Sequence, residues 1–203
     1  MNTENFNTTL LEKFSTHKAT LIQDTDRFLI IDWKREDGSG DYYVNYIVDK
    51  KRGSLIVSGD LGDSIATWYN PIDPSKLKTW IHNDIGYYIG KLQCASDKYT
   101  YNAEDVVADI RDHFADYDIS VEELIENGTL DFDDEREFWD EIQYEASIST
   151  QRDNFTPTTD IINIMESIDI DYWEWLYNCG RRIDNRVYMW AEGFYMACKQ
   201  LEI

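Results

Sequence analysis

Two aspartates in a glycine-containing turn are the residues of this chain best placed for chemistry at a single site. Asp60 and Asp63 lie within Ser58–Ser64, where Gly59 and Gly62 flank Asp60. Such a turn can present a carboxylate as a metal ligand or catalytic group, and it can equally use the carboxylate to accept backbone N–H groups. A metal-dependent hydrolase would need further His or acidic ligands. Both interpretations, a small hydrolase using Asp60 and Asp63 and a structural turn, stay open.

Other catalytic or metal-binding patterns are weak. The acidic loop that starts at Asp131 fails as a calcium loop, because its sixth position is Arg136 and its twelfth is Ile142. There is no P-loop, no G-x-G-x-x-G and no G-x-S-x-G. The three histidines have no spacing typical of metal ligands: His17, His82 and His113. The sequence therefore predicts no catalytic residue, no metal and no cofactor, and it favours a protein that is not an enzyme.

The distribution of charge is more informative than any motif. The segment Tyr101–Ala146 holds seventeen Asp and Glu against two Arg, a net charge of −15, whereas the whole chain has a net charge of −21. The first hundred residues are close to neutral, with twelve basic and fourteen acidic side chains. Crowding like charges costs stability through self-repulsion. We therefore expect the acidic segment to face a positively charged partner.

Two helices are expected to arrange these carboxylates in stripes. At steps of three and four residues, neighbouring side chains on a helix lie about 5–6 Å apart, and neither stripe contains an interleaved Lys. Rows of this spacing and sign resemble the phosphate rows of a duplex. We predict that both stripes bind a partner, with an ordinary solvated acidic surface as the alternative. They comprise Asp105, Asp109, Asp112 and Asp116 on the first helix, and Asp134, Glu137, Glu141 and Glu145 on the second.

The composition narrows the class of partner. A pI near 4.3 argues against direct binding of nucleic acid or of anionic membranes, both of which require Lys and Arg. Twenty-nine aromatic residues argue for a folded protein rather than a disordered one. The N-terminus has no basic and apolar regions typical of a signal peptide, and no apolar run is long enough for a membrane span. The three Cys have no paired spacing, so we expect buried free thiols and a cytoplasmic protein.

The elements that would hold these residues predict an α+β fold. Alternating or β-branched stretches predict an antiparallel meander of three to five strands at Ala19–Gln23, Arg27–Trp33, Tyr42–Asp49, Ser54–Ser58 and Ser64–Tyr69. Helical periodicity then dominates. We expect helices at Asn5–Phe14, from Asp73-Pro74 to Leu92, at Asn102–Tyr117, from Ser120 to Gly128, at Asp133–Ala146, from Thr156-Pro157 onward, at Asp171–Cys179 and at Asn185–Leu201, with a polar loop at Ser147–Phe155. The predicted domains are a sheet with a packed helix over residues 1–100 and a helical region over residues 101–203. The acidic segment of the helical region spans residues 101–146.

A resemblance adds a biological setting. The stretch Tyr43–Gly62, continuing to Trp68-Tyr69-Asn70, resembles a segment of uncharacterised proteins carried by phages and mobile elements of Gram-positive bacteria. That family implies no functional residue. By class and charge, small acidic phage proteins resemble DNA mimics that act against host defence nucleases, anti-CRISPR proteins among them.

These observations lead to one expected function with two alternatives. The chain is expected to be a phage-type inhibitor that binds a DNA-binding defence protein of the host cell, such as a CRISPR effector nuclease, through its acidic helices. The partner would be the basic surface of a nucleic-acid-binding protein. The hydrolase using Asp60 and Asp63, and a plain protein-interaction module, are the alternatives.

Overall fold

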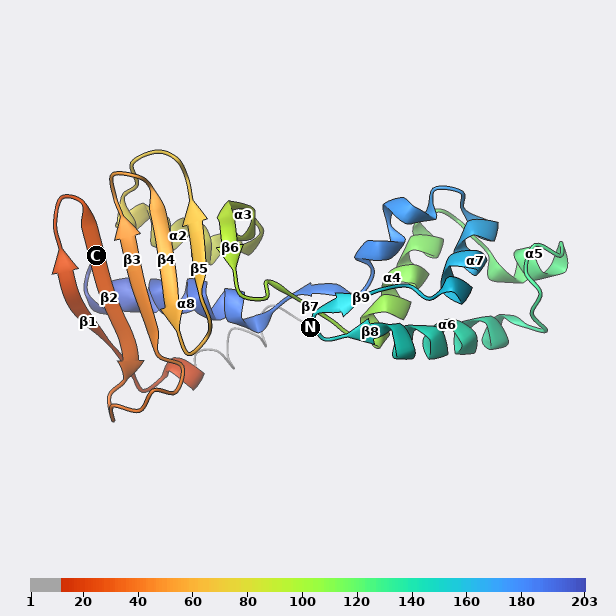
Figure 1. Ribbon diagram of the computed structural model, residues 1–203, viewed down its shortest axis with the longest axis horizontal. Helices are drawn as coiled ribbons and strands as arrows, with labels where there is room; N and C mark the ends of the chain where they lie inside the picture. Colours follow the sequence, from red (N-terminus) through yellow and green to blue (C-terminus); the bar gives the residue numbers. More distant parts are fainter. Residues whose placement is uncertain (1–11) are drawn as a thin grey trace. The chain divides into compact units, whose positions relative to one another are not determined.

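The computed structural model describes residues 12–203 and divides the chain into two compact units (Figure 1). Unit 1 contains the chain up to Lys98 together with Asp184–Ile203, and unit 2 is Tyr99–Ile183. This division differs from the predicted one, because the last twenty residues belong with the N-terminal sheet rather than with the helical region. The expected helix Asn5–Phe14 lies mostly outside the described residues.

Unit 1 is built on one antiparallel sheet, which confirms the α+β prediction. Its six strands follow the order β1-β2-β3-β4-β5-β6. The first five form the expected meander, and β6, which was not predicted, pairs with β5 after two intervening helices. The strands are β1 (His17–Asp24), β2 (Phe28–Arg35), β3 (Val44–Asp49), β4 (Ser54–Gly59), β5 (Ser64–Thr67) and β6 (Leu92–Ala95).

Side-chain alternation decides which face of this sheet is covered. Val44, Tyr46 and Val48 share a face in β3, as the sequence predicted, and all three are fully buried. Helices α2 (Pro74–Asn83), α3 (Ile85–Lys91) and α8 (Asn185–Gln200) cover that face (Figure 1). Helix α8 comes very close to the sheet at Gly193, where a Cβ atom would lie 2.3 Å from the Tyr46 hydroxyl.

The long helix expected from Asp73-Pro74 to Leu92 is broken in the middle. Asp73 caps α2 as predicted, accepting the N–H of Ser75 at 2.9 Å. Asp84 then leaves the helical conformation and caps α3 by accepting the N–H of Tyr87 at 2.8 Å. Leu92, expected at the helix end, starts strand β6 instead.

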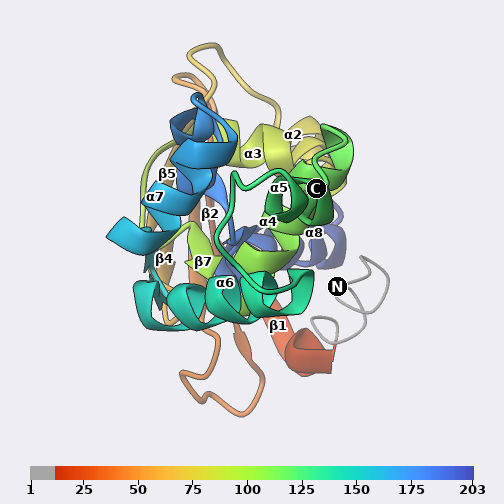
Figure 2. The same cartoon turned by 90° about the vertical axis from the view of Figure 1, so that its right-hand side faces the viewer.

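Unit 2 is mainly helical and has its own apolar core. It contains β7 (Tyr99–Tyr101), α4 (Ala103–Asp116), α5 (Val121–Glu126), α6 (Glu135–Ser149), β8 (Thr150–Gln151), β9 (Asn154–Phe155), α7 (Thr159–Ile168), two 3₁₀ turns at Tyr172–Glu174 and Leu176–Asn178, and β10 (Arg181–Ile183). Helix α6 lies beside α4 (Figure 2). Ile110, Phe138 and Ile142 are fully buried between them, with Phe114 only 3% exposed.

Two local predictions in unit 2 were wrong. The expected polar loop Ser147–Phe155 is the last turn of α6 followed by the small hairpin β8–β9. The expected helix Asp171–Cys179 is two 3₁₀ turns, in which Trp175 and Leu176 pack against the core while Trp173 and Tyr177 stay exposed. Strands β7 and β10 pair with each other at the two ends of unit 2, a long-range pairing that the sequence pattern did not reveal.

Candidate interaction surface

The structure concentrates the negative charge of the chain in unit 2. This unit has 23 acidic side chains against five Arg, whereas unit 1 has seventeen acidic against fourteen basic. Unit 2 contains no Lys. Eighteen of its 23 acidic residues are exposed. Net charges of −18 and −3 for the two units show that acidity belongs to one folded body and not to the chain as a whole.

Half of the first predicted stripe is used inside unit 2. Asp109 accepts two hydrogen bonds from the Arg182 guanidinium, at 2.6 and 2.8 Å, and a third from the N–H of Gly180 at 2.7 Å. The Asp105 carboxylate lies 3.1 Å from the same guanidinium. Arg182 therefore neutralises much of the charge of these two carboxylates. No Lys is interleaved in the stripe, but Arg182 reaches it from β10, far along the chain.

This pairing changes how Asp109 ionises. Burial of the carboxylate tends to raise its pKa, but the hydrogen bonds from Arg182 and Gly180 outweigh burial and lower the pKa overall. Gly180 has a φ of +73°, and an added Cβ would lie 2.4 Å from Val106. Asp109 is therefore a structural residue that holds the 179–182 turn against α4.

The second half of this stripe is free to meet a partner. Asp112 and Asp116 are exposed on the C-terminal half of α4. Tyr117, the C-cap of α4, is 70% exposed. An exposed Tyr among carboxylates is a common anchor in protein interfaces.

The second predicted stripe is divided in a similar way. Asp134 and Glu137 are exposed at the start of α6, where Asp134 accepts the N–H of Glu137 at 2.8 Å and Glu137 accepts the N–H of Asp133 at 2.7 Å. This reciprocal cap fixes the first turn of the helix. Further along, Glu141 is half-buried and Glu145 is only 5% exposed. Of the eight predicted carboxylates, four are exposed: Asp112, Asp116, Asp134 and Glu137.

The exposed carboxylates concentrate instead along the chain from the C-terminal half of α4, through α5, to the first turns of α6. Twelve of them lie between residues 112 and 140, where Arg136 is the one Lys or Arg. Arg136 is itself paired with Asp140, at 4.0 Å. We call this set the acidic surface: Asp112, Asp116, Asp118, Glu122, Glu123, Glu126, Asp131, Asp133, Asp134, Glu135, Glu137 and Asp140. The α5 glutamates within it were not predicted, and the signal that could have found them is the complete lack of Lys.

A groove of about 300 Å³ lies among the elements that carry this surface. Residues of α4, α5 and α6 line it, including Phe114, Val121 and Trp139 on the apolar side and Glu122 on the polar side. The Trp139 indole donates to Glu135 at 3.0 Å. The Arg111 guanidinium lies over the same indole, 4.2 Å from its centroid. The groove gives the acidic surface a concave, partly aromatic centre.

Two of the five Arg of unit 2 lie at this surface, Arg111 in the groove and Arg136 beside Asp140, and two others are engaged elsewhere. Arg182 is held by Asp105 and Asp109. Arg181 lies over the Tyr99 ring, 4.9 Å from its centroid. The acidic surface therefore has a strongly negative potential in which no Lys is interspersed, unlike an ordinary solvated helical surface.

The turn at Asp60 has a structural role in unit 1. Asp60 Oδ2 accepts the N–H of Tyr42 at 2.8 Å, and the N–H of Asp60 donates to the Tyr43 carbonyl at 2.9 Å. The carboxylate thereby ties the end of β4 to the residues before β3. Asp63 is exposed, and its backbone bonds to Ser96. Over residues 12–203, no three His, Cys, Asp or Glu side chains gather in a way that could hold a metal ion.

The cysteines are free thiols in different environments. Cys179 and Cys198 are buried, and burial raises the pKa of each thiol to about 12. Cys94 is exposed on β6, contrary to the expectation that all three are buried. The buried pair is unreactive at neutral pH, because the thiolate is the nucleophile.

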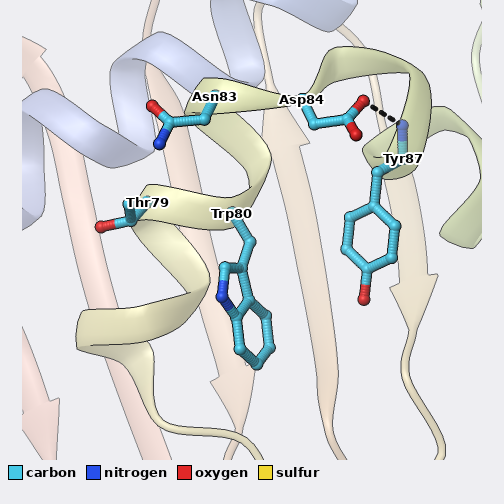
Figure 3. Close-up of a pocket in the computed structure, with 5 residues that line it drawn as sticks. All are labelled: Thr79, Trp80, Asn83, Asp84 and Tyr87. Atoms are coloured by element: carbon cyan, nitrogen blue, oxygen red, sulfur yellow. Dashed lines mark hydrogen bonds between the residues drawn. The ribbon is translucent and has the colours of Figure 1, made fainter.

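Unit 1 has a surface pocket of about 340 Å³ where α2 meets α3 (Figure 3). In Figure 3 the rings of Trp80 and Tyr87 point the same way, and they are 43% and 38% exposed. Asp84 caps α3 with its carboxylate. The lining adds Thr79 and Asn83 and contains no His, Cys or Lys. It offers an aromatic surface beside the Asp84 carboxylate.

Comparisons of the chain with protein-family models, with curated proteins and with solved structures find no match. Within residues 12–203, no helix combines the length and the apolar character that a membrane crossing requires.

Proposed function

We propose that this chain is a binding protein whose unit 2 occupies the nucleic-acid-binding surface of another protein. The observation that carries the proposal is the acidic surface: twelve exposed carboxylates within residues 112–140, accompanied by a single Arg. A surface that binds phosphates is lined by Lys and Arg. The acidic surface is complementary to such a site in charge, and complementary charge also accelerates association.

The mechanism would be competition by charge mimicry. A rigid body carrying closely spaced carboxylates can replace phosphates on a basic groove, and the caps of α4, α5 and α6 hold these carboxylates on fixed helices. Tyr117 and the groove beside Trp139 would add apolar contacts. Such contacts give specificity that charge alone does not provide.

An inhibitor of a DNA-binding defence protein of a phage host, such as a CRISPR effector nuclease, is the specific form of this proposal. It would act in the cytoplasm of the host cell, where such a nuclease works. The acidic character supports the class of target, and the resemblance of Tyr43–Asn70 to phage-borne proteins supports the setting. No catalytic step is required of the chain.

A displacement experiment tests the proposal. Purified DNA-binding nucleases, each carrying a fluorescent duplex, are titrated with the protein while fluorescence anisotropy reports the bound fraction. We expect displacement from at least one nuclease, with an apparent affinity that falls steeply as salt rises. Retention of the duplex by every nuclease, or displacement that is insensitive to salt, would contradict the proposal.

A further inference from the structure

One face of the unit 1 sheet carries an unbroken apolar row. Ile30 pairs with Ile47, Ile47 with Ile56, and Ile56 with Ile65 in adjacent strands. Ile65 then pairs with Cys94 at the edge strand β6. These five residues, which we call the isoleucine row, are directly opposed across β2 to β6. A row of this kind is a continuous apolar strip that runs across the strands.

The isoleucine row lies on the face that the helices of unit 1 leave open. Successive side chains in a strand point to opposite faces. The neighbouring row, which includes Ile31, Tyr46 and Val57, is fully buried beneath the helices. The isoleucine row therefore faces the other way, and Figure 1 shows α2, α3 and α8 all on the far side of the sheet. Its residues are partly exposed, and Ile65 is 38% exposed.

Polar side chains flank the row but satisfy one another. On one side, Asp32 accepts hydrogen bonds from the Tyr43 hydroxyl at 3.1 Å and from Asn45 at 2.8 Å. On the other side, Asp49 is paired with Arg27 at 3.0 Å. An open face of an antiparallel sheet ordinarily presents polar residues to water. Here the two carboxylates beside the row, Asp32 and Asp49, are paired, and the isoleucines are the groups that would gain most from a partner.

We propose that the occupant of this face is a second copy of the chain, packed sheet against sheet about a two-fold axis. An apolar row is its own complement under such an axis, because the same patch is presented by both copies. With strands about 4.8 Å apart and about 3.3 Å per residue, the six-stranded face covers about 500 Å². Two such faces bury about 1,000 Å², which is the threshold for a biological interface and falls among the weak, transient ones.

Charge favours this face over the rest of the molecule as a self-contact. Unit 1 has a net charge of only −3, so two copies can approach through it at little electrostatic cost. Contacts between two copies of unit 2, each at −18, would be strongly repelled. A small apolar interface of this kind predicts a weak, reversible dimer.

Sedimentation velocity of the full chain over a range of concentrations tests the proposal. We expect the average mass to rise from 24.0 kDa toward twice that value, more readily at high salt, because salt screens the residual repulsion. Ile56→Lys and Ile65→Lys should each weaken the dimer at least tenfold. Leu21→Lys is the matched control: Leu21 is 45% exposed and pairs with Ile31, so it adds the same charge to the opposite face. The control should dimerise like the wild type.

Thermal unfolding distinguishes loss of dimer from loss of fold, and Ile65→Lys is the safer variant because its side chain is already exposed. A wild-type chain that stays monomeric to several hundred micromolar would overturn the proposal. Weakening by Leu21→Lys equal to that by Ile65→Lys, with both variants folded, would also overturn it, because the contact would then lie elsewhere.

Cys94 gives an independent measurement of the same contact. It is the exposed thiol at one end of the row, while Cys179 and Cys198 are buried. If the two-fold axis runs along the row, a short bismaleimide should join Cys94 to Cys94. If the axis runs along the strands, it should join Cys94 to a cysteine introduced by Ile30→Cys. Either product supports the proposal. Cross-linking that persists in both Ile56→Lys and Ile65→Lys would contradict the proposal.

Discussion

Asp109 and Asp112 lie three residues apart on α4, yet they should respond to the same substitution in different ways. Asp109 accepts three hydrogen bonds from Arg182 and Gly180, and Asp112 is exposed. We predict that Asp109→Asn destabilises unit 2 while Asp112→Asn does not. The comparison decides which carboxylates of the stripe hold the fold and which are available to a partner.

The size of the effect follows from the contacts. A hydrogen bond to a charged group contributes about 1.5–3 kcal/mol, but the Arg182 side chain is 41% exposed and Asp109 is 27% exposed, so solvent screens part of the ion pair. Asn keeps one acceptor, and Arg182 keeps Asp105. We expect a loss of about 1–3 kcal/mol for Asp109→Asn. For Asp112→Asn we expect a change within about 0.5 kcal/mol, toward greater stability, because it removes a repelled charge.

Urea unfolding followed by circular dichroism measures both variants, with two transitions allowed because the chain has two units. In a thermal melt, the same loss of 2 kcal/mol would lower the Tm of a domain the size of unit 2 by about 8–16 °C. Because the folded pKa of Asp109 is lowered, its contribution is present above its unfolded pKa of about 4 and is lost as pH falls through the folded value. The difference between wild type and Asp109→Asn should therefore shrink in acid. Equal stability of the two variants at neutral pH would refute the structural assignment of Asp109.

Three further predictions concern backbone and buried groups. Gly180→Ala should lower the stability of unit 2 by about 2–4 kcal/mol, because φ is positive and the new Cβ would clash with Val106. Gly128 also has a positive φ but no atom within 4 Å of an added Cβ, so Gly128→Ala should cost about 1 kcal/mol. Similar losses in the two variants would show that packing against Val106 is not involved. Asp60→Asn should lower the stability of unit 1 by about 1 kcal/mol, because it weakens the hydrogen bond from the Tyr42 N–H. It should leave the displacement of a duplex unchanged. An unaltered melting curve would argue against a structural role for Asp60. Burial lowers the pKa of His113, so its stabilising contribution is present above its ordinary pKa near 6.5 and lost as pH falls below it. The melting temperature of unit 2 should fall between pH 7.5 and 5.5, and His113→Gln should flatten that fall; parallel profiles would contradict it.

Local signals in the sequence predicted the elements well where they depend on neighbours in the chain. The alternation in Tyr42–Asp49 predicted β3, and the Asp73-Pro74 pair predicted the start of α2. What the sequence could not show were pairings between distant segments, such as β7 with β10 and α8 with the N-terminal sheet. Those contacts depend on tertiary packing, which local periodicity does not report.

The sequence predicted which segment of the chain is acidic, but it did not predict which carboxylates are exposed. The density of carboxylates indicated which part of the chain is acidic, but helical spacing alone cannot tell an exposed stripe from one that meets a cation. Asp109 finds Arg182, which is 73 residues away in the chain. The clue was present, since Arg181 and Arg182 are the one adjacent basic pair in the sequence of unit 2. The shift of the acidic surface toward α5 follows from these internal pairings.

The central claim is that a localised surface, and not the total charge, makes this chain a binding protein. Two triple variants that change the net charge equally test it most directly. One neutralises α5 by Glu122→Gln, Glu123→Gln and Glu126→Gln, and the other neutralises exposed carboxylates of unit 2 outside the acidic surface by Asp153→Asn, Asp160→Asn and Glu166→Gln. In the duplex-displacement assay at fixed salt, we predict that the α5 variant loses at least tenfold in apparent affinity and that the other variant stays within about threefold of wild type. Equal losses in the two variants would contradict the claim.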